Sequence, residues 1–364
     1  MFFKVREGST AALIQLCLGY FIFYVITGVT VKYFLCTGAG FPAMKGMEFL
    51  VYSTAGGVGI SLLVVMILKW YRFESLRYVN FIGLKIPHEF LYIIPSGFFT
   101  AIVVPTTTLM YSFDGISVMM AMVLMRGSVI IIGRVVDEIQ IRQGILKKKV
   151  YAEENTAVLI AMAVVGMELL LPSESHGSSP FSSVPVMVIF ISYILAYFFR
   201  IYIMNYYKNT RPKGEQGSNK GFFAIEQITA TTFIVLAAVI AIVLFRTGVI
   251  SIPQIRIMDS AITSPVKGLW IWAVLAGVAY GIVSFFSVFI FMFKGRTATF
   301  AGLVNRVTSL IAGTTATLLF AVFFKGKYPA ISDWVSLGMI FLAVYFMTKS
   351  EKKRARELAA EKEI

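Results

Sequence analysis

Long apolar segments alternate with short polar connections along almost the whole chain. Ten segments can be drawn, each long enough to cross a bilayer as a helix of about 20 residues. They cover residues 10–35, 48–70, 89–112, 115–136, 154–172, 182–206, 221–246, 268–292, 296–324 and 331–349. The segments are too long and too uniformly apolar for the alternating strands of a membrane β-barrel. The pattern therefore predicts an all-α membrane protein with ten transmembrane helices.

The composition agrees with this prediction. Apolar residues make up 58% of the 364 residues and charged residues only 14%, with a mean hydropathy of +0.79. Soluble domains average about 45–50% apolar and about 25% charged residues. The connections are too short for a separate soluble domain, and the N-terminal residues lack a cleavable signal pattern. We therefore interpret residues 10–35 as the first membrane helix.

The placement of Lys and Arg residues explains the net charge of +14. With the N-terminus in the cytosol, most of the 33 basic residues fall on the cytosolic side, chiefly in 69–85, 134–149, 208–220 and 349–362. This bias follows the positive-inside rule, so we expect both termini in the cytosol and no nucleic-acid partner. Residues 351–364 are expected to form a basic cytosolic tail. It is either a solvated helix or a segment that binds anionic lipid head groups.

Two arginines occupy matching positions in two of the apolar segments. Arg126 follows AMVLM and Arg306 follows AGLVN, each in the middle of an apolar run. A charge at that depth costs at least about 2.5–3.5 kcal/mol, so such a residue normally faces a polar interior. Five helices in each half would give the halves opposite orientations, because five is odd. We therefore predict two inverted five-helix repeats, residues 1–176 and 177–350.

The segment around the first of these arginines resembles a known family. The sequence YSFDGISV (111–118) followed by MRGSVI (125–130) resembles the nucleotide-sugar-transporter-like branch of the drug/metabolite transporter superfamily, in the F group of solute carrier family thirty-five. Residues 298–323 and 338–345 are similar to the last two helices of EamA-type members. The chain departs from these patterns because no amide side chain precedes MRG, and NR stands at 305–306 where the triose-phosphate branch has KR.

The resemblance implies a secondary transporter for a small-molecule solute, whose two halves alternate access to a central site. It implies membrane lipid around the chain, no cofactor and no enzymatic activity, and it leaves a homodimer open. The alternative is a non-transporting membrane protein, either an integral enzyme or a scaffold. The sequence contains no HExxH, GxSxG or Gly-rich phosphate loop that would favour an enzyme. Two His and two Cys in separate segments predict no metal site.

Arg126 and Arg306 are the first candidates for contact with an anionic or zwitterionic solute. A guanidinium stays charged and presents a planar fork of donors that fits a carboxylate or phosphate. Asn305 and Ser128 lie beside them in the sequence and could add hydrogen bonds, and Tyr280 is a further candidate. The alternative is that a buried glutamate neutralises each arginine, which then serves only helix packing.

The predicted helices contain further charged residues, among them Glu226, Glu48 and Arg200. Glu226 and Glu48, each near a helix start, are candidates for a charge partner of the arginines or for a proton-coupling group. The alternative for both is a carboxylate that faces water at a helix N-terminus. Arg200 lies near the cytosolic end of its helix, and we expect it to extend to the membrane surface.

Helix-breaking and small residues gather in two segments that the repeat would make equivalent. Pro95, Gly97 and Pro105 lie in residues 89–112, and Gly277 and Gly281 lie in residues 268–292. Proline inside a membrane helix frees backbone carbonyls and permits bending. We therefore expect these helices to bend as gates, with close packing through small residues as the alternative.

Overall fold

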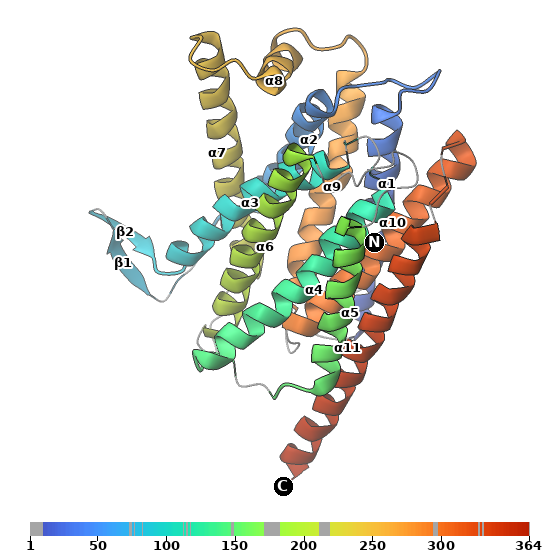
Figure 1. Cartoon of the computed structure of the whole chain (residues 1–364). Coiled ribbons are helices and arrows are strands. Elements are labelled where there is room, and N and C mark those ends of the chain that lie inside the picture. Colours follow the sequence, from blue (N-terminus) through green and yellow to red (C-terminus); the bar gives the residue numbers. More distant parts are fainter. Residues whose placement is uncertain are drawn as a thin grey trace.

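The computed structural model describes residues 10–363 except 73–74, 76, 82, 112, 114–115, 117, 147–148, 171–182, 211–218, 294–297, 327 and 330. The described chain is a bundle of long helices with one small hairpin at its side (Figure 1). The helices are α1 (Thr10–Leu35), α2 (Gly46–Ile67), α3 (Phe90–Met110), α4 (Val118–Arg142), α5 (Ala152–Leu170), α6 (Val184–Thr210), α7 (Asn219–Arg246), α8 (Pro253–Thr263), α9 (Trp270–Phe291), α10 (Ala298–Phe324) and α11 (Ile331–Glu363). The strands are β1 (Tyr78–Phe81) and β2 (Leu84–Pro87).

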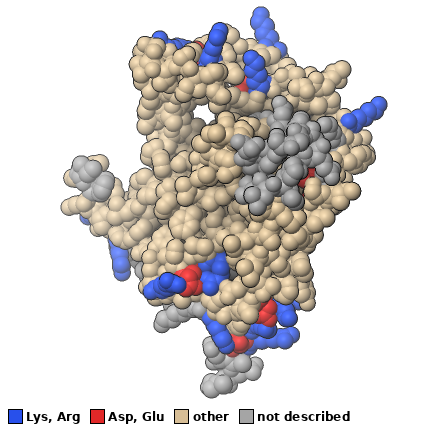
Figure 2. Space-filling view, viewed as in Figure 1, with Lys and Arg blue, Asp and Glu red and all other residues tan. Residues whose placement is uncertain are grey.

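The predicted fold class, an all-α membrane protein, is confirmed. Nine helices of the described chain are long and apolar enough to span a membrane. Helix α5, which covers the expected span 154–172, falls outside this set, since its 19 residues include three glutamates, Glu153, Glu154 and Glu168. On the face shown in Figure 2, charged side chains gather in the upper and lower parts, and the area between them is almost wholly uncharged. The chain is therefore a multi-pass membrane protein.

Helix α4 lies at the centre of the bundle. It packs against α5, α6 and α10, whereas α1 packs against α9 and α10, and α3 against α6 and α7. In the most apolar 18-residue stretch of α4, 78% of the residues are buried. The corresponding share in α7 is 6%, and the second half of α7 stands away from the bundle (Figure 1). The side chains of α4 therefore face other helices rather than lipid.

Helices α2 and α9 approach each other through glycines. A Cβ atom at Gly56 would lie 1.8 Å from the carbonyl oxygen of Val274, and one at Gly277 would lie 1.9 Å from the carbonyl oxygen of Ser53. A Cβ at Gly281 would lie 2.3 Å from the carbonyl oxygen of Gly57. Only glycine allows the backbones to come this close, as is common in membrane helix pairs.

Three features of the fold were not predicted from the sequence. A short helix, α8, lies in the connection between α7 and α9, where Arg246 Nη2 contacts Asp259 Oδ1 at 2.7 Å and Tyr52 donates to the carbonyl of Ala261 at 2.8 Å. The hairpin β1–β2 joins α2 to α3. The third feature is that the last helix is continuous through Glu363, so the basic tail extends α11 instead of following it.

Contacts with the start of α5 hold this C-terminal extension. Glu154 accepts a hydrogen bond from Ser350 at 2.8 Å, and Lys353 pairs with Glu153. Tyr151 donates to Glu357 at 2.6 Å, and this hydrogen bond, with a smaller effect of burial, raises the pKa of Tyr151 to about 12. The extension is therefore tied to the bundle on one side and exposes its other side.

Candidate functional site

The two arginines identified from the sequence lie inside the bundle, on helices that pack against each other. Arg126 of α4 is 4% exposed and Arg306 of α10 is 2% exposed. Helices α4 and α10 are in contact along the centre of the molecule. Neither side chain therefore faces lipid, as the cost of exposing a guanidinium to hydrocarbon requires.

Tyrosines from two other helices surround these guanidinium groups. Arg126 Nη2 donates to the hydroxyl of Tyr24 at 2.5 Å, and its Nη1 lies 3.5 Å from the hydroxyl of Tyr197. The guanidinium of Arg306 lies 5.7 Å from the ring centroid of Tyr197 and 5.4 Å from that of Phe291. Tyr197 thus contacts both arginines, one through its hydroxyl and the other through its ring. Cation–π contacts of this kind contribute about 0.5–2 kcal/mol each.

Each half of the chain contributes a pair of these tyrosines, one helical turn apart. Tyr20 and Tyr24 lie on α1 with ring centroids 5.2 Å apart, and Tyr193 and Tyr197 lie on α6 with centroids 4.9 Å apart. The hydroxyl of Tyr24 also lies 3.1 Å from that of Tyr111. This set was not predicted from the sequence. The signal was present, since Tyr-x-x-x-Tyr occurs in the first helix of each predicted half.

Several donors in this cluster have no hydrogen-bond partner. They are the Nε atoms of Arg126 and Arg306, Nη1 of Arg306 and the hydroxyl of Tyr193. Among the described residues, no carboxylate forms an ion pair with either arginine. A buried donor without a partner costs about 1–3 kcal/mol, and more when it is charged. The cluster therefore has the charge and the free donors that an anion needs, and no glutamate among the described residues neutralises either arginine.

The other predicted site residues differ in how far they are free to bind. Asn305 accepts a hydrogen bond from Tyr20 at 3.4 Å and donates to Ser287 at 3.1 Å, so both ends of its amide are engaged. The hydroxyl of Ser128 donates to the carbonyl of Leu124 in its own helix at 2.9 Å. Tyr280 of α9 is half-buried and lies within hydrogen-bonding reach of Thr107.

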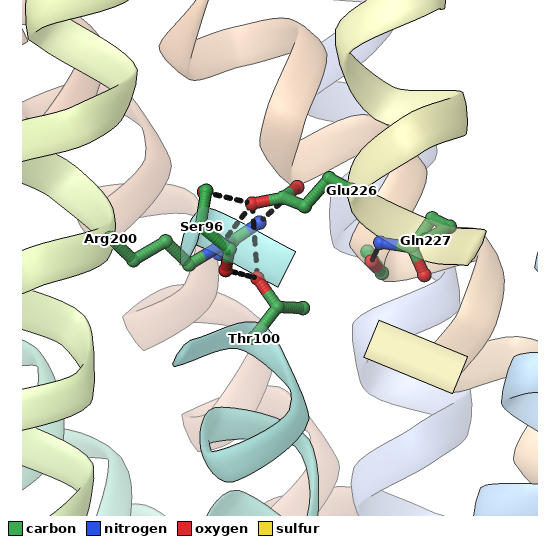
Figure 3. A network of polar contacts seen from close by, with 6 residues as sticks. Ser96, Thr100, Arg200, Glu226 and Gln227 are labelled. Atoms are coloured by element: carbon green, nitrogen blue, oxygen red, sulfur yellow. Dashed lines mark hydrogen bonds and ion pairs between the residues drawn. The ribbon is translucent and has the colours of Figure 1, made fainter. Parts of the chain in front are cut away.

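Glu226 lies at the centre of a separate buried network (Figure 3). The carboxylate of Glu226 accepts from Arg200 Nε at 2.9 Å and Nη2 at 3.0 Å, a two-point ion pair. The hydroxyls of Ser96 and Thr100 donate to the same carboxylate at 2.7 and 3.0 Å. The network joins α3, α6 and α7, because its members come from these three helices.

This network corrects two expectations. Arg200 is 5% exposed and paired, so the prediction that it extends to the membrane surface is wrong. Glu226 is 0% exposed, so it does not face water at the helix start. As a charge partner it serves Arg200, and neither central arginine. Glu48 is half-buried in the first turn of α2.

The residues predicted to form gates lie inside continuous helices. Pro95 and Pro105 lie within α3, which is helical from Phe90 to Met110. A Cβ atom at Gly97 would lie 2.6 Å from Cβ of Thr229 in α7. Together with the glycine contacts of α9, this shows the close packing that was expected as the alternative to bending. A bending motion stays a prediction.

Comparison with known proteins bears on the fold. No protein-family model matches the chain, and no curated protein matches it. One solved structure, described only as the crystal structure of a protein, superposes with a TM-score of 0.53 at 12% sequence identity. The match covers 95% of this chain and 99% of the other. At this identity the likeness shows a shared fold over almost the whole length of both chains, and it shows nothing about activity.

Proposed function

We propose that the chain is a secondary transporter that binds a small anionic or zwitterionic metabolite between α4 and α10 and moves it by alternating access. The observation that carries the proposal is the pair Arg126 and Arg306, buried in the bundle with unpartnered donors and with no described carboxylate bonded to them. An anionic group between them would satisfy these donors and offset two buried positive charges.

The helix contacts support the inverted repeat that such a mechanism needs. In this repeat each helix of the first half has an equivalent in the second: α1 and α6, α2 and α7, α3 and α9, α4 and α10, α5 and α11. Replacing each helix by its equivalent turns observed helix contacts into other observed contacts. The contact of α1 with α9 becomes that of α6 with α3, α2 with α9 becomes α7 with α3, and α1 with α10 becomes α6 with α4. Under this matching we infer ten membrane helices, including α5, with both termini in the cytosol.

The same matching relates the residues of the site. Arg126 beside Tyr24 corresponds to Arg306 beside Tyr197, and Tyr20 corresponds to Tyr193. The arginines differ by the same offset as Gly97 and Gly277, and the two tyrosine pairs share one offset of their own. A binding site on such an axis is typical of transporters built from inverted repeats.

Two helix contacts are our candidates for closing the site from opposite sides. Gly97 of α3 lies against the backbone carbonyl of Glu226 in α7, and Gly277 of α9 lies against the backbone carbonyl of Ser53 in α2. Ser53 therefore takes the place in α2 that Glu226 has in α7. In the α3–α7 contact, Ser96 and Thr100 of α3 also donate to Glu226, whose carboxylate is paired with Arg200 of α6. The α2–α9 contact is held by glycine packing. Glu226 stays our candidate for a coupling group.

The alternative is a membrane protein that does not transport, either an enzyme or a scaffold. Among the described residues, no group of three or more His, Cys, Asp or Glu side chains could hold a metal ion. A scaffold needs no buried, unpaired guanidinium groups, so it leaves the cost of burying them unexplained. These observations favour a transporter over an enzyme or a scaffold.

The proposal is tested first by ligand stabilisation and then by transport. Purified protein is screened by thermal unfolding against inorganic phosphate, sugar phosphates, nucleotide sugars, organic acids and amino acids. A ligand at about 100 times its Kd stabilises the folded state by about 2.7 kcal/mol. We expect an anion to raise the unfolding temperature and to exchange across proteoliposome membranes.

Substitutions at the two arginines connect the result to the site. Arg126→Gln and Arg306→Gln should each remove both the stabilisation and the transport. Arg142→Gln, at the exposed end of α4, is the matched control and should leave both intact. Transport that survives in both glutamine variants would remove the arginines from the mechanism, and stabilisation by neutral compounds alone would overturn the anionic substrate class.

A further inference from the structure

The hairpin between α2 and α3 has two chemically different faces. Antiparallel pairing sets Val79 opposite Ile86 and Asn80 opposite Lys85. Because side chains alternate along a strand and directly paired residues share a face, Val79, Ile86 and Leu84 lie on one face. Tyr78, Asn80 and Lys85 lie on the other, where the ammonium group of Lys85 is 5.6 Å from the ring centroid of Tyr78.

The apolar face is only partly covered by the protein. Leu84, next to the turn, is 69% exposed, while Val79 and Ile86 at the base are half-buried. The hairpin projects from the side of the bundle beside the start of α3 (Figure 1). A two-stranded hairpin is at best marginally stable alone in water. Covering its apolar face with another apolar surface would therefore stabilise the hairpin.

Basic side chains surround the hairpin. Lys69 and Arg72 follow the end of α2, Arg77 precedes β1 and Lys85 lies in β2, and all four are exposed. None of them forms an ion pair with a described carboxylate. Glu89, which begins the next helix, accepts a hydrogen bond from Ser75 at 2.7 Å. These cations are therefore available to a partner that carries negative charge.

The position of the hairpin indicates which partner this is. It connects the end of one membrane helix to the start of the next, so it lies at the level where the bilayer surface meets the bundle. Trp70 and Tyr71 follow the end of α2 on the way to the hairpin, and aromatic residues are enriched at this level of the membrane. An apolar face with cations beside it matches an anionic lipid surface, where each Lys or Arg contributes about 1 kcal/mol.

We propose that the β1–β2 hairpin is an interfacial anchor that binds anionic phospholipid. The face with Leu84 lies against the acyl boundary of the leaflet, and Lys85, Arg77 and their basic neighbours contact the phosphate groups. This role is independent of solute transport. It ties the connection between α2 and α3 to the lipid surface.

Paired fluorescent labels on the two faces test this placement. Cys17 and Cys36 are replaced by Ser in the full chain, and Leu84→Cys or Asn80→Cys is labelled with an environment-sensitive fluorophore. The protein is placed in nanodiscs of phosphatidylcholine, with or without phosphatidylserine, and spin-labelled lipid serves as quencher. We expect blue-shifted emission and several-fold stronger quenching at position 84 than at position 80, with the difference increasing in phosphatidylserine.

The contribution of the cations is measured in the same system. Lys85→Gln combined with Arg77→Gln should remove the effect of phosphatidylserine on the label at position 84, whereas Arg256→Gln on exposed α8 should not. Water-like emission at both positions in every lipid mixture would overturn the proposal. Such a result would mean that the face of Leu84 is open to water. Quenching that does not depend on anionic lipid would overturn the phospholipid specificity.

Discussion

At the scale of single residues, the Arg200–Glu226 pair gives the sharpest prediction about stability. Removing one partner of a buried ion pair leaves the other charge without compensation and costs about 3–5 kcal/mol. Arg200→Met and Glu226→Gln should therefore each destabilise the folded protein, and Arg200→Met with Glu226→Gln should recover much of the loss. Glu153→Gln, which breaks an exposed pair with Lys353, should change stability by less than about 1 kcal/mol.

Thermal unfolding of the four variants in one detergent measures these differences. If the double variant is as unstable as the sum of the singles, the two residues do not act as a pair. If Glu226→Gln is neutral, the carboxylate carries no charge in the folded state.

The sequence identified some of these residues and misjudged others for physical reasons. Arg126 and Arg306 could be found because a guanidinium in the middle of an apolar run has no route to water. Arg200 was misjudged because a cation near a helix end can reach the surface without a partner, so its pairing depends on which helix packs beside it. The same lack of packing information made the central arginines the candidate partners of Glu226, which in the structure pairs with Arg200.

At the scale of elements, the contact between α2 and α9 should tolerate no added side-chain volume. Gly56→Ala or Gly277→Ala would place a methyl group less than 2 Å from a carbonyl oxygen of the facing helix. Overpacking of this kind costs about 1–3 kcal/mol, occasionally more. The matched control is Gly59→Ala on the same helix, because nothing lies within 4 Å of a Cβ there.

Melting curves of these three variants measure how closely the two helices pack. A loss of stability at 56 and 277 with a neutral result at 59 supports the close contact. Equal effects at all three positions would show that the helix resists alanine in general, and the glycine contact would lose its support.

The pattern of apolar residues predicts some helices and strands and misses others. Long helices were predicted well because a bilayer demands about 20 apolar residues in each of them. The hairpin was missed because four-residue strands are too short to display an alternating pattern, and α8 because eleven residues with mixed polarity resemble a loop. Helix α11 was drawn too short, since its extension depends on contacts with the start of α5.

At the scale of the whole molecule, the proposed closing contacts predict two states, each open on one side of the site. A mutation that weakens one contact should shift the populations of these states. If the α3–α7 contact and the α2–α9 contact close the site from opposite sides, weakening one favours the state in which that side is open. A change of 1.4 kcal/mol in the difference between the two states alters their ratio about tenfold. Replacing both Arg200 and Glu226 by Met removes the ion pair without leaving a buried charge, so it should act on this balance.

Cysteine accessibility measures the balance in the folded protein. In a background without Cys17 and Cys36, Thr229→Cys reports on the α3–α7 contact and Ser53→Cys on the α2–α9 contact, each labelled by a membrane-impermeant thiol reagent in proteoliposomes. Removing the ion pair should raise the labelling rate at 229 and lower it at 53, because opening one side closes the other. Rates that rise together would indicate loosening of the whole bundle, and unchanged rates would show that the ion pair is a packing feature without a part in access.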